Sequence, residues 1–390
     1  MGELGSLKNG MNFSKEAMGH GFPFINLQNI FGNNVIDVNK LELADATEKQ
    51  LLEYSLLKGD VLFVRSSVKL EGVGEAALVP ETLENTTYSG FIIRFRDEYG
   101  LNNDFKKYIF GTQKVRNQIM AQATNSANKN ISQGVLENLT FEVPSFDEQA
   151  KIGEHFSNLD HLITLHQRKC EQTKKLKKYM LQKMFPRNGA KVPEIRFDGF
   201  TYDWEQRKLG EIYGSIGNAF VGTATPYYAE HGHFYLESNN VKDGQINHNA
   251  EIFINDEFYE KQKDKWLHTG DMVMVQSGHV GHAAVIPEEL DNTAAHALIM
   301  FRNPKEEIEP YFLNYEYQTD KAKKQIENIT TGNTIKHILA SDMQEFVVDI
   351  PKYEEQKVIA SYFCKLDHLI TLHQRQTDFY KKPNFYFISS

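Results

Sequence analysis

Three histidines in the second half of the chain could, by residue type, bind a metal ion: His279, His282 and His296. No carboxylate or cysteine spacing typical of a zinc site accompanies these histidines. We therefore interpret them as residues of the surface or of a binding face. The sequence predicts no metal site.

Other motifs that would indicate catalysis are missing. The segment from Gly278 to His282 resembles a phosphate-binding loop but lacks its lysine. The chain has no Asn/Asp-Pro-Pro-aromatic motif for base methylation, and no glycine-rich cofactor loop after a strand. We expect no catalytic residues in this chain.

The decapeptide Leu-Asp-His-Leu-Ile-Thr-Leu-His-Gln-Arg occurs twice, at Leu159–Arg168 and at Leu366–Arg375, 207 residues apart. A repeat of this kind indicates a tandem duplication of similar units, although the regions between the two copies have diverged. The residues that also match upstream at this offset include Pro144 with Pro351, Glu148 with Glu355, and Gln149 with Gln356.

Length and composition predict two or three globular domains, because 390 residues with 41% hydrophobic side chains can form large cores. The net charge of −9 argues against a nucleic-acid partner, yet nine basic residues and one acidic residue lie between Arg168 and Lys191. This run is typical of the solvated face of a long helix. Cys170 and Cys364 are not at equivalent positions, and no secretory signal or long apolar run occurs, so we expect a reducing cytoplasm and no membrane.

Apolar residues recur every three or four positions between 147 and 184, which predicts a long amphipathic helix. Ser145 and Glu148 form a capping box at its start, whereas the second copy has Lys352 at the capping position. The repeat offers a partner helix for an antiparallel intramolecular coiled coil, and a dimer through the same stripe is the alternative. The expected contact residues are Ile152, Phe156, Leu159, Ile163, Ile359, Phe363, Leu366 and Ile370.

The regions outside these helices contain short strand-like runs and short helices, as in mixed α/β (α+β) domains. We expect strands at 61–64, 90–95, 272–275, 297–301 and 346–350, and short helices within 104–121 and 310–327. The expected division is two globular domains at 1–144 and 188–351, helical segments at 145–187 and 352–376, and an irregular tail at 377–390, where Pro383 opposes a helix.

Two diverged α/β domains, each followed by a near-identical helix that opens with Pro-x-x-x-Glu-Gln, resemble the specificity subunit of type I restriction-modification systems. The most specific features are these helix starts, the repeated decapeptide, the segment Lys177–Phe185, and Val-Pro-Glu-Ile-Arg-Phe-x-Gly-Phe before Trp204. The resemblance covers nearly the whole chain.

This resemblance implies two target recognition domains, each of which reads one half of a bipartite, asymmetric sequence in double-stranded DNA. It implies that the helices act as a spacer and dock methyltransferase subunits, two in number, through which restriction/translocase subunits join the complex. The chain would then be a non-catalytic, DNA-binding subunit that binds no cofactor. S-adenosylmethionine, ATP and Mg are expected on the partner subunits.

Base edges in DNA are read by polar side chains, with Arg favouring guanine and Asn or Gln favouring adenine. Two polar loops in each half fit this role, and a third possibility is Asn26, Gln28 and Asn29, answered by Glu237, Asn239 and Asn240. The expected readers are Arg65, Ser66, Ser67, Lys69, Asn125, Ser126, Asn128, Lys129 and Asn130 in the first half, and Gln276, Ser277, His279, Thr331, Asn333, Thr334, Lys336 and His337 in the second.

Two departures from the family pattern stand out. The repeat fails after Arg375, and nothing before Met1 answers residues 192–207. We therefore expect one methyltransferase dock to be weaker than the other, or absent. The alternative interpretations are a coiled-coil protein-interaction scaffold and a truncated specificity subunit that is impaired in assembly.

Overall fold

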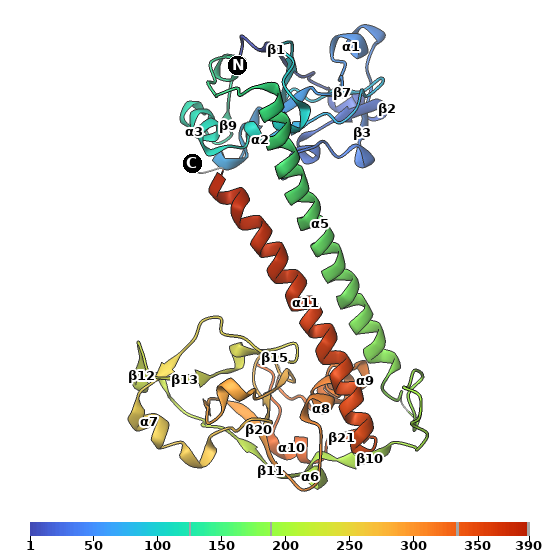
Figure 1. Ribbon diagram of the computed structural model, residues 1–390, viewed down its shortest axis with the longest axis vertical. Coiled ribbons are helices and arrows are strands. Elements are labelled where there is room, and N and C mark those ends of the chain that lie inside the picture. The colour runs from blue at the N-terminus through green and yellow to red at the C-terminus, as the bar shows by residue number, and fades with distance from the viewer. Residues whose placement is uncertain (125, 188, 333–334, 388–390) are drawn as a thin grey trace. The chain divides into compact units, whose positions relative to one another are not determined.

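The computed structural model describes residues 1–124, 126–187, 189–332 and 335–387, with side chains as far as Lys381. The chain forms two compact units (Figure 1). Unit 1 comprises Met1–Arg168 together with the chain from Gln374 onward, and unit 2 comprises Lys169–His373. Each unit therefore includes part of both long helices.

Unit 1 is built on a four-stranded antiparallel sheet with the strand order β1-β8-β4-β6, beside a smaller sheet with the order β3-β2-β7. A two-stranded ladder joins β5 to β9. The strands are β1 (Gly5–Asn9), β2 (Met18–Ile25), β3 (Glu42–Ala44), β4 (Val61–Val64), β5 (Ser66–Ser67), β6 (Ala76–Leu78), β7 (Thr87–Tyr88), β8 (Ile92–Asp97) and β9 (Lys129–Asn130). The helices are α1 (Glu48–Glu53), α2 (Asn103–Ile109), α3 (Gln113–Gln122), α4 (Gln133–Glu137) and the first part of α5 (Phe146–Lys183).

Unit 2 repeats this plan with the sheet β11-β20-β17-β18, a second sheet β12-β16-β13-β19, and the two-stranded pairs β10-β21 and β14-β15. The strands are β10 (Glu205–Lys208), β11 (Tyr213–Asn218), β12 (Tyr228–Ala229), β13 (His233–Leu236), β14 (Val241–Lys242), β15 (Gln245–Ile246), β16 (Phe253–Ile254), β17 (Met272–Val275), β18 (Ala283–Val285), β19 (Ala294–Ala295), β20 (Leu298–Pro304) and β21 (Val347–Ile350). The helices are α6 (Leu209–Ile212), α7 (Asp256–Glu260), α8 (Pro310–Glu316), α9 (Asp320–Ile329), α10 (Ala340–Gln344) and α11 (Tyr353–Phe387).

The central strand of each main sheet is apolar at every position because it lies between two cores. In β4, Val61 and Phe63 face the core that contains α3, whereas Leu62 and Val64 face the core shared with the smaller sheet. Successive side chains of a strand point to opposite faces, so a strand covered on both faces needs a continuous apolar run. β17 follows the same rule in unit 2. The mixed α/β class and the five expected strands are confirmed.

The same glutamine contacts hold each long helix to its globular part. The Nε2 atom of Gln149 donates to the carbonyl oxygen of Pro144 at 2.9 Å, and its Oε1 accepts from the backbone N of Asn102, just before α2, at 3.0 Å. In unit 2, Gln356 makes the same two bonds, to Pro351 at 2.9 Å and from Glu309 at 3.0 Å. Both glutamines are 2% exposed. The repeated Glu-Gln start therefore has a structural cause.

A tyrosine–aspartate bond adds a second matched contact. The hydroxyl of Tyr108 donates to Asp160 at 2.9 Å in unit 1, and the hydroxyl of Tyr315 donates to Asp367 at 2.8 Å in unit 2. Burial is the main cause that raises the pKa of both tyrosines. Both aspartates belong to the repeated decapeptide, so this part of the repeat also contacts the globular parts.

Within each unit, α5 and α11 run antiparallel. In unit 2, Lys177 pairs with Asp367 at 2.7 Å and the Cys170 thiol lies 3.8 Å from the Ile370 carbonyl oxygen. In unit 1, the rings of His166 and Tyr380 stack with their centroids 5.7 Å apart. These contacts agree with the expected antiparallel helix pair.

Part of the expected coiled-coil seam packs elsewhere. Ile359, Phe363 and Leu366 lie in the main core of unit 2, where the Phe363 ring is 5.0 Å from the ring of Tyr315 on α8. Phe156 packs against Tyr108 on α2, with ring centroids 5.2 Å apart. The amphipathic stripe thus serves largely to attach each helix to its own globular part.

The expectation of an irregular tail from residue 377 was wrong as far as Phe387, because α11 continues to that residue. A proline removes one backbone donor, and the helix on both sides of position 383 tolerates that single loss. Residues 388–390 lie outside the described part of the chain. Among the helices that the structure describes, none is long and apolar enough to cross a membrane.

Candidate nucleic-acid interface

In unit 1 the two expected reader loops lie side by side. β5 pairs with β9 so that Ser66 faces Asn130 and Ser67 faces Lys129. The backbone N of Ile131 also donates to the carbonyl oxygen of Arg65 at 3.0 Å. This pairing brings together polar side chains that are more than sixty positions apart in the sequence.

Some polar side chains of this loop pair make hydrogen bonds within the protein, whereas others line a cavity. The Arg65 guanidinium donates to the Gly90 carbonyl oxygen at 3.3 Å, and the Lys129 ammonium donates to the Ser126 carbonyl oxygen at 2.9 Å. Ser66, Ser67, Lys69 and Asn128 instead line a cavity of about 510 Å³ with apolar neighbours. Asn125 lies outside the described residues.

Unit 2 brings its two loops together in the same way. Ser277 and His337 form an isolated antiparallel bridge. The backbone N of Gly278 donates to the Lys336 carbonyl oxygen at 3.1 Å, and that of Ile338 donates to the Gln276 carbonyl oxygen at 2.9 Å. Thr331 exchanges two backbone hydrogen bonds with His337, at 2.8 and 2.9 Å. Asn333 and Thr334 lie outside the described residues.

The third pair of polar segments has a structural role. The Asn29 side chain is buried and donates to the carbonyl oxygens of Asp37 and Lys40, both at 3.2 Å. Its counterpart Asn240 is buried and donates to the carbonyl oxygens of Asn247 and Asn249, at 3.1 and 3.3 Å. These asparagines hold neighbouring loops in place and are not available to a ligand.

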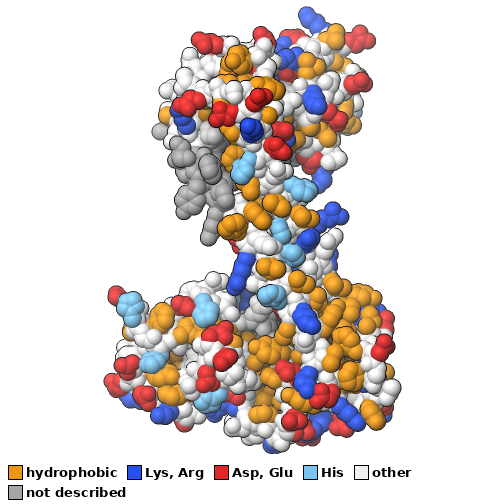
Figure 2. Space-filling model, viewed as in Figure 1, with side chains coloured by type: hydrophobic (Ala, Val, Ile, Leu, Met, Phe, Trp, Pro, Cys, Tyr) orange, Lys and Arg blue, Asp and Glu red, His pale blue; other side chains and the backbone are white. Residues whose placement is uncertain are grey.

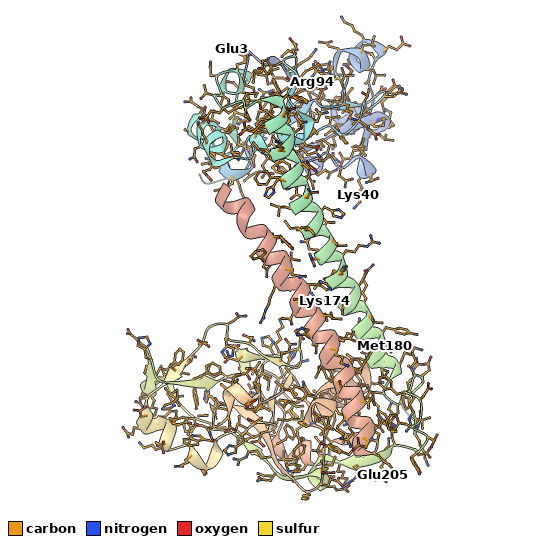
Figure 3. The ribbon with its side chains drawn as sticks, in the orientation of Figure 1. Glu3, Lys40, Arg94, Lys174, Met180 and Glu205 are labelled. Carbon is orange, nitrogen blue, oxygen red and sulfur yellow. The ribbon has the colours of Figure 1, made fainter. Side chains whose placement is uncertain are left out.

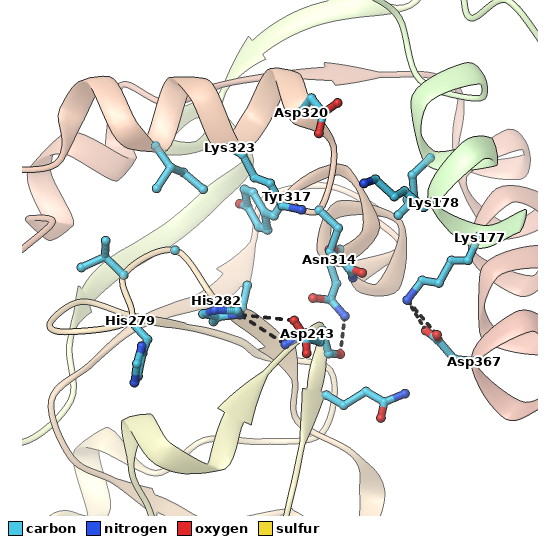
Figure 4. Close-up of a pocket in the computed structure, with 18 of the residues that line it drawn as sticks. Lys177, Lys178, Asp243, His279, His282, Asn314, Tyr317, Asp320, Lys323 and Asp367 are labelled. Carbon is cyan, nitrogen blue, oxygen red and sulfur yellow. Dashed lines mark hydrogen bonds and ion pairs between the residues drawn. The ribbon is translucent and has the colours of Figure 1, made fainter. Parts of the chain in front are cut away.

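A groove of about 810 Å³ extends from the loop pair of unit 2 to α9 and to the part of α5 that belongs to this unit (Figure 4). Gly278, His279 and Lys336 of the two loops line it. Lys178 reaches it from α5 and Lys323 from α9, beside the ring of Tyr317 (Figure 4). Lys174 and Met180 mark the same stretch of α5 (Figure 3).

Asp367 and His282 in the groove already make hydrogen bonds within the protein. The carboxylate of Asp367 accepts both from Lys177 and from the Tyr315 hydroxyl. His282 accepts at Nδ1 from the backbone N of Asp243 at 3.2 Å, and burial is the main cause that lowers its pKa. A neutral imidazole fits this hydrogen bond, because the accepting nitrogen must carry no proton.

The lysines of α5 and α9 were missed as candidates for binding. The basic run from Arg168 to Lys191 was the available signal, and it was interpreted as a solvated helix face. On the face shown in Figure 2, Lys and Arg side chains are interspersed with Asp and Glu, so overall charge does not mark the groove. Only the fold shows which lysines stand next to the loops.

The three histidines do not form a common site. His282 contacts Asp243, whereas His296 lies 2.9 Å from the Gly222 carbonyl oxygen and 3.3 Å from Glu237. Within the described residues, no group of three or more His, Cys, Asp or Glu side chains converges as metal ligands would.

Solved structures from type I restriction-modification systems resemble this one. The fold resembles the type I restriction-modification S subunit from M. genitalium, with a TM-score of 0.59 and 13% identity over 99% of this chain and 93% of that one. A chain from a structure that describes complex assembly and conformational transition of the type I R-M system has a TM-score of 0.58, with 18% identity over 99% and 95% of the two chains. These likenesses establish the fold.

Sequence comparisons agree with the fold. The chain is 24% identical over 388 residues to the putative type I restriction enzyme MjaX specificity subunit of Methanocaldococcus jannaschii, covering 95% of this chain and 86% of that protein. It is 28% identical over 151 residues to the EcoKI specificity subunit of Escherichia coli, covering 38% and 32%. The model of the type I restriction modification DNA specificity domain matches residues 1–175 and again 202–378. The chain therefore belongs to the family of type I restriction-modification specificity subunits and carries two of its DNA specificity domains, one in each half.

Proposed function

We propose that each unit reads one half of a bipartite, asymmetric DNA target through its pair of adjoining loops. The supporting observation is that two polar loops lie together in each unit and carry different side chains. Arg65, Ser67 and Asn130 stand in unit 1, where unit 2 has Gln276, Gly278 and His337. Different polar groups at equivalent places would select different bases, because base edges are distinguished by their donors and acceptors.

The chemistry would belong to partner subunits. As a family member, this chain is a DNA-recognition subunit without catalytic groups of its own, and the long helices would dock methyltransferase subunits. S-adenosylmethionine, ATP and Mg would bind to those partners and to the restriction/translocase subunits. The cytoplasm is the proposed compartment, in keeping with two cysteines, Cys170 and Cys364, that are not at equivalent repeat positions.

Methylome mapping tests this function. Methylated adenines are mapped in cells that express the methyltransferase with this chain and in cells that express the methyltransferase alone. A bipartite motif with a fixed gap is expected only in the first cells. An unchanged methylome would favour a protein scaffold, or a specificity subunit impaired in assembly.

A further inference from the structure

Three lysines around the groove of unit 2 have free ammonium groups. Lys178 of α5, Lys323 of α9 and Lys336 of the second reader loop line the groove, and each is exposed. None of the three ammonium groups has a hydrogen-bond or ion-pair partner within the described residues. Asp243, Asp320 and Glu327 are the acidic side chains of the lining that remain after the pairing of Asp367, because a neutral His282 does not compensate the charge of Asp243.

The counterparts of two of these lysines in unit 1 are already engaged. At the offset of 207 residues, Lys323 corresponds to Arg116 of α3 and Lys336 corresponds to Lys129. The Arg116 guanidinium donates to the Glu71 carbonyl oxygen at 2.6 Å, and Lys129 donates to the Ser126 carbonyl oxygen at 2.9 Å. The counterpart of Lys178 is position 385, whose side chain lies outside the described part of the chain.

We infer that Lys178, Lys323 and Lys336 contact backbone phosphates of the target DNA and so supply part of its salt-dependent affinity, while both units read bases. This inference rests on the proposed function. Both reader loops of unit 2 line the same groove, and DNA held by those loops would present its phosphates to the neighbouring lysines. Phosphate contacts fix the position of a protein on DNA without selecting sequence.

An acidic surface of a partner protein would be the other occupant with suitable charge. DNA is favoured because the groove is lined by the loop pair as well as by the helix α5. The loop residues in the lining are Gly278, His279 and Lys336. A protein dock would need no such continuity.

The salt dependence of DNA binding tests the inference. The chain is purified with its methyltransferase, and affinity for a duplex with the mapped motif and for a scrambled duplex is measured between about 50 and 200 mM salt. Each phosphate contact adds about 0.9 to the slope of log affinity against log salt for duplex DNA. The triple variant K178Q/K323Q/K336Q should therefore lose about 2.7 from the slope, which is a change of roughly 40-fold over this salt range. The loss should be equal for both duplexes.

Matched variants control for the change of charge. Lys324→Gln removes a neighbouring exposed lysine of α9 that lies outside the groove lining, and it should leave the slope unchanged. The three single variants of the groove should each lower the slope by about 0.9.

Two outcomes would overturn the inference while the proposed function stands. One is a methylation motif that appears only with the chain, combined with a triple variant whose slope of log affinity against log salt is unchanged. The other is an unchanged slope together with loss of the methyltransferase on purification, which would make the groove a protein dock. Failure of the unchanged chain to direct any motif would instead reject the proposed function.

Discussion

The two units share the contacts that attach a long helix to the globular part and differ in the side chains of their reader loops. Gln149 and Gln356 make the same two hydrogen bonds, and Tyr108 and Tyr315 make the same bond to an aspartate. The main sheets also have equivalent strand orders. The reader loops pair in the same way but differ in side chains, because His337 stands where unit 1 has Asn130 and Gln276 where unit 1 has Arg65. The contacts that attach the helix are thus common to both units, whereas the surfaces proposed to bind DNA differ in their side chains.

The units also differ in how deeply the helix is buried. Ile359 and Leu366 are buried, whereas their counterparts Ile152 and Leu159 are half-exposed. In unit 2, Phe185 and Trp204 belong to the core that covers the helix, with ring centroids 5.9 Å apart. Unit 2 should therefore depend more on its helix for stability.

Shortening Phe363 should have the largest effect. Phe363 is fully buried, so Phe363→Ala should lower the free energy of unfolding of unit 2 by about 3 to 5 kcal/mol through lost contacts and a cavity. Phe156→Ala, at the matched half-buried position, should cost clearly less for unit 1. Urea unfolding followed by tryptophan fluorescence reports unit 2, which contains Trp204 and Trp266, and circular dichroism reports both units. Equal losses of stability at the two positions would show that unit 2 does not depend more on its helix than unit 1.

The second largest loss of stability should follow from breaking a buried ion pair of unit 2 that has no equivalent among the described residues of unit 1. Glu355 is 2% exposed and accepts from Arg196 at both carboxylate oxygens, each at 2.7 Å, whereas Glu148 is exposed. Glu355→Ala leaves the Arg196 charge without its carboxylate and should destabilise unit 2 by about 3 kcal/mol. Glu148→Ala should change stability by about 0.5 kcal/mol or less. A tolerated Glu355→Ala would show that the pair adds little.

Removing the glutamine contacts should have a smaller effect on stability, and this effect should be equal in both units. Gln149→Ala and Gln356→Ala each remove two buried hydrogen bonds and leave a backbone N–H unpaired, at an expected cost of about 1 to 3 kcal/mol. Thermal unfolding of both variants measures the cost, with Gln172→Ala as a control on an exposed helix position. A large effect in one unit alone would contradict the shared attachment.

The sequence predicted what depends on local pattern. The apolar runs of β4 and β17 are visible because both faces of these strands are covered, and the repeated Glu-Gln marked the helix starts. The pattern also indicated the polar loops, because such residues interrupt the strand runs.

What depends on tertiary contacts was not predictable. No local signal shows that Arg65 and Lys129 donate to nearby carbonyl oxygens, while Lys323 has no such partner among the described residues. The apolar stripe at Phe363 indicates burial but not whether a partner helix or a globular core covers it. Pro383 was given too much weight, because α11 continues through this residue.

The central claim is that each unit reads its own half of the target through its own loop pair. The most direct measurement is the methylome of cells that carry the Ser277→Ala/His337→Ala variant, beside cells that carry the matched Ser66→Ala/Asn130→Ala variant. Each variant should relax or change one half of the motif and leave the other half and the gap between them intact, with the two variants affecting opposite halves. The claim would be contradicted if both variants altered the same half, or if neither altered the motif while methylation persisted.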